Sequence, residues 1–197
     1  MTSITLSTPL SESKVRSLKI GDTIDLDGQI VLARDRAHQR LFELAMLGGP
    51  APFELDRSAI YHCGPLAREI RGEWQILSAG PTTSARMERF EPQIVRTYRV
   101  RMIIGKGGMG SNTTEAMKEV GSVYCAAAGG AGALLAKSVK KVKGVEWKEF
   151  GIAEAVWLLE VEKMGPLVVA IDAHGNNLYD AVSRKAEGLL GLHSTRS

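Results

Sequence analysis

The sequence predicts a mixed α/β protein in which a sheet is covered by helices. Beyond residue 74, apolar runs of strand length alternate with segments of helical periodicity. The first third is instead rich in turn signals, above all the Asp27-Gly28 pair between two β-prone runs. A sheet buries its apolar face beneath helices, which gives a layered architecture. Because no repeat, low-complexity tract or linker divides the chain, we expect one domain over residues 1–197.

The first half contains a predicted hairpin and a predicted amphipathic helix. An Asp-Gly pair suits a type I′ turn, so residues 23–26 and 29–32 are expected to pair across Asp27-Gly28. A helix with Ala37 and Leu41 on its apolar stripe follows, and the Gly- and Pro-rich residues 48–52 end it. The other elements predicted in this half are a short helix at 11–18, strands at 59–63 and 74–79, and a polar link at 68–73.

Capping patterns predict two helices in the second half. Thr83 or Ser84 suits the N-cap of a helix that Pro92 kinks or restarts. Asn112 with Glu115 resembles a capping box at the start of the next helix. The remaining predicted elements are strands at 100–104, 123–126, 145–150, 158–161 and 167–171, and helices at 133–142 and 178–190.

The composition excludes several classes of protein. A net charge of +3 over 197 residues is too small for a nucleic-acid-binding domain. The two cysteines, Cys63 and Cys125, are too few for a disulfide framework or a cysteine-rich zinc site, so we expect reduced, buried thiols in a cytoplasmic protein. No apolar run approaches the roughly 20 residues of a membrane span, and the first residues lack a signal-peptide pattern. We therefore expect neither nucleic acid nor membrane as a partner.

The segment AGPTTSARM, residues 79–87, is the first candidate for chemistry. A tight turn here delivers hydroxyl groups to a helix start, where free N–H groups attract an anion. Thr82 and Arg86 are four residues apart, so their side chains can share a face. Arg86 can grip a carboxylate with two hydrogen bonds. The alternative is a helix cap beside a surface arginine.

The segment IGKGGMG, residues 104–110, is the second candidate. Its glycines allow the backbone to approach a ligand closely, and Lys106 supplies a positive charge. It matches neither the P-loop pattern nor the dinucleotide-binding pattern. The alternative is a flexible turn with a solvated lysine.

Three further segments are weaker candidates. Arg34 follows a predicted strand, and together with His38 it can face one way across the first helical turn. His62 and Cys63 point to opposite faces of a strand, so His62 does not easily activate the thiol. The turn after residue 171 holds an aspartate and a histidine but no third ligand, so we predict no metal site in this chain.

Six segments taken together resemble the beta subunit, or C-terminal domain, of class I fumarases and L-tartrate dehydratases. In order they are ARDRAH, YHCGP, AGPTTSARM, IGKGGMG, GIAEAVW and GPLVVAIDAHGNNLYD, and they span nearly the whole chain. Each is weak alone, but the ordered set is highly specific. The chain differs from many relatives in Cys63, where alanine is expected, and in Ala131, where a cysteine often occurs. Neither difference removes a charged or hydroxyl group.

The resemblance implies a swivelling β/β/α fold and a hydro-lyase reaction, the reversible hydration of fumarate to L-malate. It implies a [4Fe–4S] cluster, and two cysteines are too few to hold one, so the cluster would be ligated by a partner alpha subunit in a hetero-oligomer. By resemblance, Arg34, Arg86 and Lys106 contact the substrate carboxylates with Thr83 beside them. Thr82 is the candidate base at C3, unless a partner carboxylate has that role, and Lys106 also acts in catalysis.

Other functions remain open at this point. L-tartrate dehydratase differs by one substrate hydroxyl group, and mesaconate hydration is a lesser variant. A non-catalytic anion-binding module is the alternative of a different class.

Overall fold

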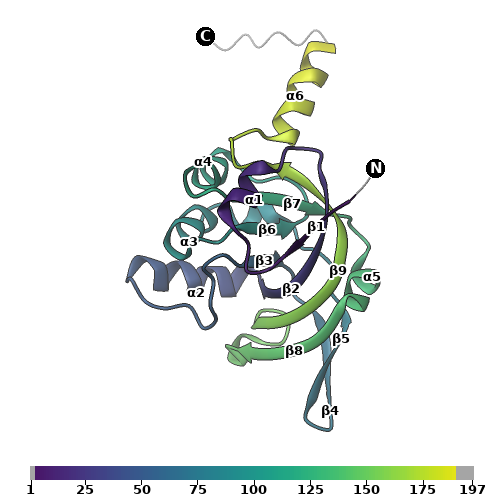
Figure 1. The fold of residues 1–197 in the computed structure, drawn as a ribbon. Helices are drawn as coiled ribbons and strands as arrows, with labels where there is room; N and C mark the ends of the chain where they lie inside the picture. The colour runs from purple at the N-terminus through teal and green to yellow at the C-terminus, as the bar shows by residue number, and fades with distance from the viewer. Residues whose placement is uncertain (1–2, 190–197) are drawn as a thin grey trace.

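A computed structural model describes residues 3–189, in which one mixed sheet carries most of the chain (Figure 1). The order of its strands is β1-β2-β3-β6-β7-β9-β8, and β2 also pairs with β9. The pairing therefore closes into a ring of β2, β3, β6, β7 and β9. The bounds are β1 (Ile4–Ser7), β2 (Thr23–Ala33), β3 (Ala59–His62), β6 (Met102–Gly105), β7 (Val123–Ala127), β8 (Val139–Glu146) and β9 (Val156–Ile171).

Strand direction within the ring determines where a site can form. Strands β2, β3, β6 and β7 are mutually parallel, and β9 runs antiparallel to both β2 and β7. The carboxyl ends of the four parallel strands therefore lie at one edge, which is where ligands bind in α/β sheets. Buried side chains such as Leu26, Tyr61, Ile104 and Trp157 belong to the apolar cluster that joins the strands of this ring.

Three helices cover one side of the strands in a second apolar layer (Figure 1). They are α2 (Asp35–Met46), α3 (Glu91–Tyr98) and α4 (Ser111–Val120). Their buried residues Leu41, Ile94 and Met117 pack in one cluster with Ile60 and Ile103 from the strands. This layer follows from the amphipathic periodicity of the helices.

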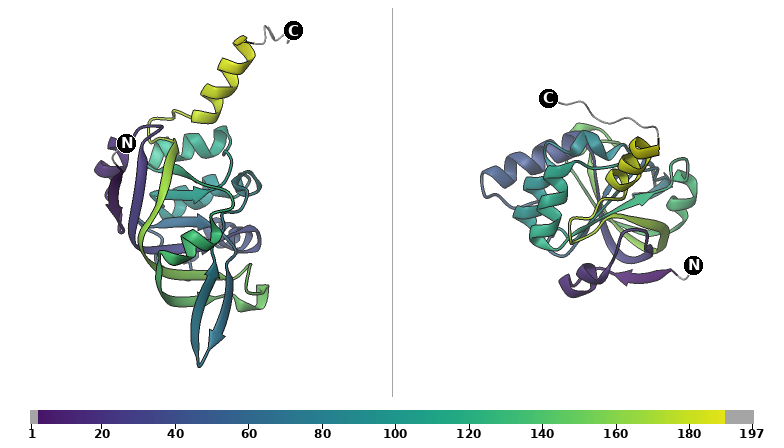
Figure 2. Two further views of the ribbon diagram at one scale, coloured as in Figure 1. Left: turned by 90° about the vertical axis from the view of Figure 1, so that its right-hand side faces the viewer. Right: turned by 90° about the horizontal axis from the view of Figure 1, so that it is seen from above.

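The remaining elements lie outside these two layers. The β4–β5 hairpin and helix α6 project from opposite ends of the molecule (Figure 2). No helix among residues 3–189 has the length and apolarity needed to cross a bilayer. The bounds are α1 (Glu12–Ser17), β4 (Leu66–Ile70), β5 (Glu73–Ser78), α5 (Gly132–Lys137), α6 (Leu178–Leu189) and the 3-10 helices η1 (Ser84–Met87) and η2 (Lys148–Phe150).

The structure confirms the mixed α/β class with flanking helices, but the predicted hairpin does not form and an unpredicted one does. The predicted hairpin at Asp27-Gly28 is one continuous strand, β2, in which Gly28 has φ +95° at a register shift against β9. Some bulges and the type I′ turn both use a residue at positive φ, so the same glycine suits either. The polar link at 68–73 was also wrong, because β4 and β5 pair there around a turn at Arg71 and Gly72.

Several other boundaries also differ from the predictions. The helix expected at 133–142 ends at Lys137, because β8 begins at Val139 and pairs with β9. The strand expected at 145–150 ends at Glu146, and the two strands expected at 158–161 and 167–171 are one long strand, β9. The Asn112–Glu115 capping box does not form, since Gly110 is the N-cap of α4. Leu190, the expected end of the last helix, lies outside the described residues.

Candidate active site

The candidate residues from the sequence meet at the carboxyl edge of the parallel strands. Arg34 directly follows β2, Cys63 follows β3 and Lys106 follows β6. Because these strands are adjacent and parallel, residues distant in sequence become neighbours at this edge. The edge therefore brings together the segments ARDRAH, YHCGP and IGKGGMG.

The loop carrying Thr82 and Thr83 lies across the ends of β3 and β6. The Thr82 N–H donates to the His62 carbonyl at 2.7 Å, and the Lys106 N–H donates to the Thr82 carbonyl at 3.2 Å. The Ser84 N–H then donates to the Lys106 carbonyl at 2.9 Å. Thr83 and Lys106 thus pair like residues of adjacent parallel strands, and the two candidate loops form one surface.

Arg86 holds Thr82 and Asp35 together. Its Nη2 donates to Thr82 Oγ1 at 2.8 Å, so Thr82 and Arg86 share a face as predicted. Nε and Nη2 of Arg86 donate to the two carboxylate oxygens of Asp35, each at 2.8 Å. Among the residues that the structure describes, only Nη1 of this guanidinium lacks a protein partner.

Asp35 is a site residue that the sequence reasoning missed. The hydrogen bond from Arg86, opposed by partial burial and reinforced by the charge of Arg86 and a hydrogen bond from Arg34, lowers the pKa of Asp35 to about 2. The same carboxylate raises the pKa of Arg86. The signal was present in the sequence, since Asp35 stands between Arg34 and Arg36.

Arg34 is held by two carboxylates. Its Nε lies 2.9 Å from Glu154 Oε1, and its Nη2 lies 3.1 Å from Asp35. A Cβ on Gly64 would come within 3.0 Å of the Arg34 side chain. The glycine of YHCGP therefore leaves room for that side chain. Arg34 does not share its orientation with His38, which is buried beneath the helix.

Lys106 differs from the two arginines in having no ion pair within the described part of the chain. Its side chain is exposed and passes Gly129, where an added Cβ would lie 3.4 Å from Lys106 Cδ. The glycine-rich loop after β6 is anchored by Glu88, which accepts hydrogen bonds from the Gly110 N–H at 2.7 Å and the Thr113 N–H at 3.2 Å. Within the described residues, the edge thus presents an exposed lysine without an ion pair, on a loop whose backbone pairs with Thr83.

The two cysteines do not suit an iron–sulfur cluster. Cys63 and Cys125 are fully buried. Burial, slightly offset at Cys63 by the charge of Arg34, raises the pKa of each thiol to about 12. Clusters bind thiolates, and cubane clusters need several of them. The thiols therefore act as apolar side chains, in agreement with the prediction that His62 does not activate Cys63.

Two other groups of side chains contain potential metal ligands. Asp172 accepts hydrogen bonds from the backbone N–H groups of His174 and Asn176, which is an ordinary polar turn. His38, His62 and Glu91 form a fully buried cluster behind the Thr82 loop, which the sequence reasoning did not detect. No local sequence pattern indicates this cluster, because its members come from three separate elements, α2, β3 and α3.

Comparison with known proteins gives consistent matches. The fumarase C-terminus family matches residues 1–182. The "Putative L(+)-tartrate dehydratase subunit beta" of Methanocaldococcus jannaschii is 44% identical over 177 residues, covering 89% of this chain and 91% of the relative. The "L(+)-tartrate dehydratase subunit beta" of Escherichia coli is 39% identical over 173 residues, covering 88% and 85%. The "Putative fumarate hydratase class I" of Geobacillus stearothermophilus is 40% identical over 184 residues, covering 93% of this chain but 35% of that longer relative.

Proposed function

This chain belongs to the fumarase C-terminus family, and on that basis we propose that it is the beta subunit of a class I fumarate hydratase. The observation that carries the proposal is the contact between Arg86 and Thr82, in a loop whose next residue, Thr83, pairs with Lys106. This arrangement offers a proton acceptor and separate cationic groups, which a dicarboxylate with a reacting carbon between its ends requires. We also assign the fold to the swivelling β/β/α type and treat residues 1–197 as one domain.

In this proposal the chain's residues act on the dehydration of L-malate as follows. The Thr82 oxygen, after its hydroxyl proton has passed to solvent, accepts the proton from C3, and the hydrogen bond from Arg86 Nη2 stabilises the alkoxide before that transfer. Lys106, Arg34 and Arg86 Nη1 hold the two carboxylates, with Thr83 beside Lys106. As the C3–H bond breaks, charge spreads into the adjacent carboxylate, and the cationic groups stabilise that charge.

We propose that the partner alpha subunit supplies the [4Fe–4S] cluster, since the two buried cysteines of this chain do not fit one. When bound, that cluster supplies Lewis acidity to the departing hydroxyl group. A covering partner also suits the exposure of the site. The Arg86 side chain is 44% exposed and that of Asp35 is 36% exposed, and catalytic electrostatics are stronger once water is excluded.

L-tartrate dehydration is the second candidate, and one observation favours it. The two relatives that this chain covers nearly end to end carry the name of the tartrate dehydratase beta subunit, whereas the fumarate hydratase relative is a much longer chain. The substrates differ by one hydroxyl group, so the described residues serve either reaction.

The test uses this chain co-expressed with its alpha subunit and purified without oxygen. We expect turnover of fumarate or L-tartrate by the two-chain enzyme, with the ratio of the two kcat/KM values deciding between the candidates. The chain alone, treated with iron and sulfide, should retain no stoichiometric cluster and show no turnover. A two-chain protein that binds dicarboxylates but converts neither would support the anion-binding module instead.

A further inference from the structure

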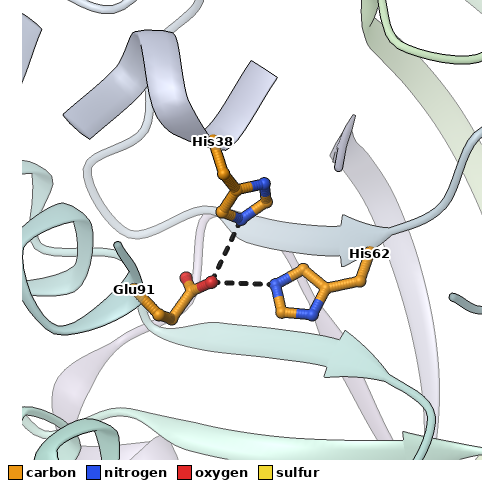
Figure 3. A group of neighbouring side chains, drawn as sticks. All are labelled: His38, His62 and Glu91. Atoms are coloured by element: carbon orange, nitrogen blue, oxygen red, sulfur yellow. Dashed lines mark hydrogen bonds and ion pairs between the residues drawn. The ribbon is translucent and has the colours of Figure 1, made fainter. Parts of the chain in front are cut away.

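We propose that His38, Glu91 and His62 form a buried charge network that positions Thr82, Asp35 and Arg86, which makes the three residues positioning residues for the hydro-lyase reaction. This inference rests on the proposed function. The three side chains are 0% exposed and come from α2, α3 and β3 (Figure 3). Glu91 Oε2 lies 2.9 Å from His62 Nε2 and 3.0 Å from His38 Nε2. One carboxylate oxygen therefore faces both imidazole rings.

A carboxylate without solvent contact requires a compensating charge. Burial alone would raise the pKa of Glu91, but the charges and hydrogen bonds of His38 and His62 outweigh it and hold this pKa at about 2. Glu91 is therefore ionised at neutral pH, and both imidazoles direct their Nε2 atoms at its Oε2. The other titratable groups that face the cluster are Asp35 at the start of α2 and Tyr124 on β7.

The hydrogen-bond partners of the two imidazoles differ. His38 Nδ1 lies 3.3 Å from the Arg34 carbonyl, which can only accept, so Nδ1 carries a proton. His38 Nε2 lies 3.0 Å from Glu91 Oε2, without the geometry of a hydrogen bond. His62 Nδ1 lies 2.9 Å from Ser84 Oγ, a group that can donate, so His62 can stay neutral with its Nε2–H directed at Glu91. Burial, only partly offset by Glu91, lowers the pKa of His62, which also favours its neutral form.

A metal ion fits this cluster less well than protons do. The three ligand atoms lie within 4.8 Å of one another. Two Zn–N bonds of about 2.1 Å span at most about 4.2 Å, so zinc would require the cluster to contract. The separation of 2.9 Å between His62 Nε2 and Glu91 Oε2 is the length of an ordinary hydrogen bond.

The network reaches the candidate site through three segments. His62 fastens the threonine loop on both sides, because its carbonyl accepts from the Thr82 N–H at 2.7 Å and its Nδ1 meets Ser84 Oγ. His38 lies one turn after Asp35 on α2, with its N–H bonded to the Arg34 carbonyl at 2.8 Å. Glu91 begins the helix that follows η1, which carries Arg86.

Two further features hold the loop that carries Thr82 and Ser84 against the network. Ser84 Oγ also contacts the Tyr124 hydroxyl at 2.9 Å, so β7 supports the same point. A Cβ on Gly105 would collide with Ser84 Oγ and lie 3.1 Å from His62 Nδ1. Only glycine at this end of β6 leaves room for the contact between Ser84 and His62.

The first arm of the test needs this chain alone. Imidazole ¹⁵N NMR should show His62 neutral, with its proton on the Nε2 that faces Glu91 and with an unprotonated Nδ1. In Glu91→Gln the ¹⁵N signals of His62 and His38 should both shift, whereas Glu115→Gln on the exposed face of α4 should match wild type. A His62 ring with its proton on Nδ1 alone, or stoichiometric zinc in the purified chain, would overturn the proposal.

The second arm measures kinetics in the two-chain enzyme. Glu91→Gln should lower kcat about tenfold or more while KM changes less, because the reacting groups are displaced rather than removed. Should Glu91→Gln not fold, Ser84→Ala removes only the link between His62 and the loop, and the same split of kcat from KM is expected. Wild-type kinetics in the folded variants would refute the positioning role. An inactive wild-type enzyme would instead refute the proposed function, and the NMR arm would still decide the network.

Discussion

Arg86 donates a hydrogen bond of 2.8 Å to Thr82 Oγ1 while two further hydrogen bonds fix its guanidinium on Asp35. The Asp35 carboxylate therefore orients the Arg86 guanidinium, and the guanidinium in turn faces the Thr82 hydroxyl group. In the proposed reaction Arg86 is therefore more than an anchor for substrate, since its hydrogen bond would stabilise the Thr82 oxygen.

Arg86→Lys should reduce both substrate binding and turnover. Lysine keeps the positive charge but cannot bond two Asp35 oxygens and Thr82 in one planar arrangement. We expect kcat/KM to fall on the order of a hundredfold, about 2.7 kcal/mol of transition-state stabilisation. Steady-state kinetics of the two-chain enzyme provide the measurement, with the exposed neighbour Arg89→Lys as the matched control. Equal kinetics for Arg86→Lys and Arg89→Lys would refute the assigned role.

The pair of Asp35 and Arg86 should contribute a stability that depends on pH. The folded-state pKa of Asp35 is about 2, below its ordinary 3.8. A depressed pKa means that the contribution is complete above about pH 4 and is lost as the pH falls through about 2. Because Asp35 is partly exposed, we expect on the order of 1 kcal/mol or less.

Urea unfolding of wild type and Asp35→Asn at a series of pH values measures this contribution. The difference in the free energy of unfolding should be constant between about pH 5 and 7 and shrink towards zero near pH 2. A difference that persists unchanged to about pH 2 would show that the carboxylate is not stabilised by Arg86.

Sequence patterns predicted the location of the candidate site better than its internal contacts. Arg34 and Lys106 follow apolar strands, and parallel strands bring such positions to one edge whatever the loops contain. The bond from Arg86 to Asp35 joins residues 51 apart, and the contact of His62 with Glu91 joins residues 29 apart. Such contacts depend on how α2 and α3 pack, which local periodicity does not specify.

The same difference between local patterns and long-range contacts applies to the fold. Helices such as α2 were predicted because their apolar stripe is a local property. Strand β2 was split in error, because Gly28 suits a bulge as well as a turn, and only its partner β9 distinguishes the two. Closure of the ring through β2 and β9 is a property of the whole sheet and leaves no local signal.

Lys106→Ala should raise KM and lower kcat together. Its ammonium has no partner in the described structure and is therefore available to a substrate carboxylate in both the ground state and the transition state. We expect at least a roughly tenfold change in each constant. The exposed Lys14→Ala on α1 is the control. A change in KM alone would limit Lys106 to binding, and no change in either constant would exclude it from the site.

Cys63→Ala should leave the activity of the two-chain enzyme nearly unchanged. The thiol is buried within the strand cluster, and its pKa is raised to about 12, so it supplies neither a nucleophile nor a ligand. We expect a loss of stability on the order of 1 kcal/mol from the small cavity. Kinetics and urea unfolding test both statements together. A loss of about a hundredfold in kcat in a folded variant would contradict the structural role.

The most direct test of the account is the exchange of the C3 proton of L-malate with D2O in the two-chain enzyme carrying Thr82→Val. Valine keeps the shape of threonine but removes the oxygen that Arg86 contacts. We predict that exchange and turnover are abolished while substrate affinity stays close to wild type, and that Thr97→Val, on the exposed face of α3, exchanges normally. If Thr82→Val exchanges the proton and turns over like wild type, Thr82 is not the base and that group belongs to the partner subunit.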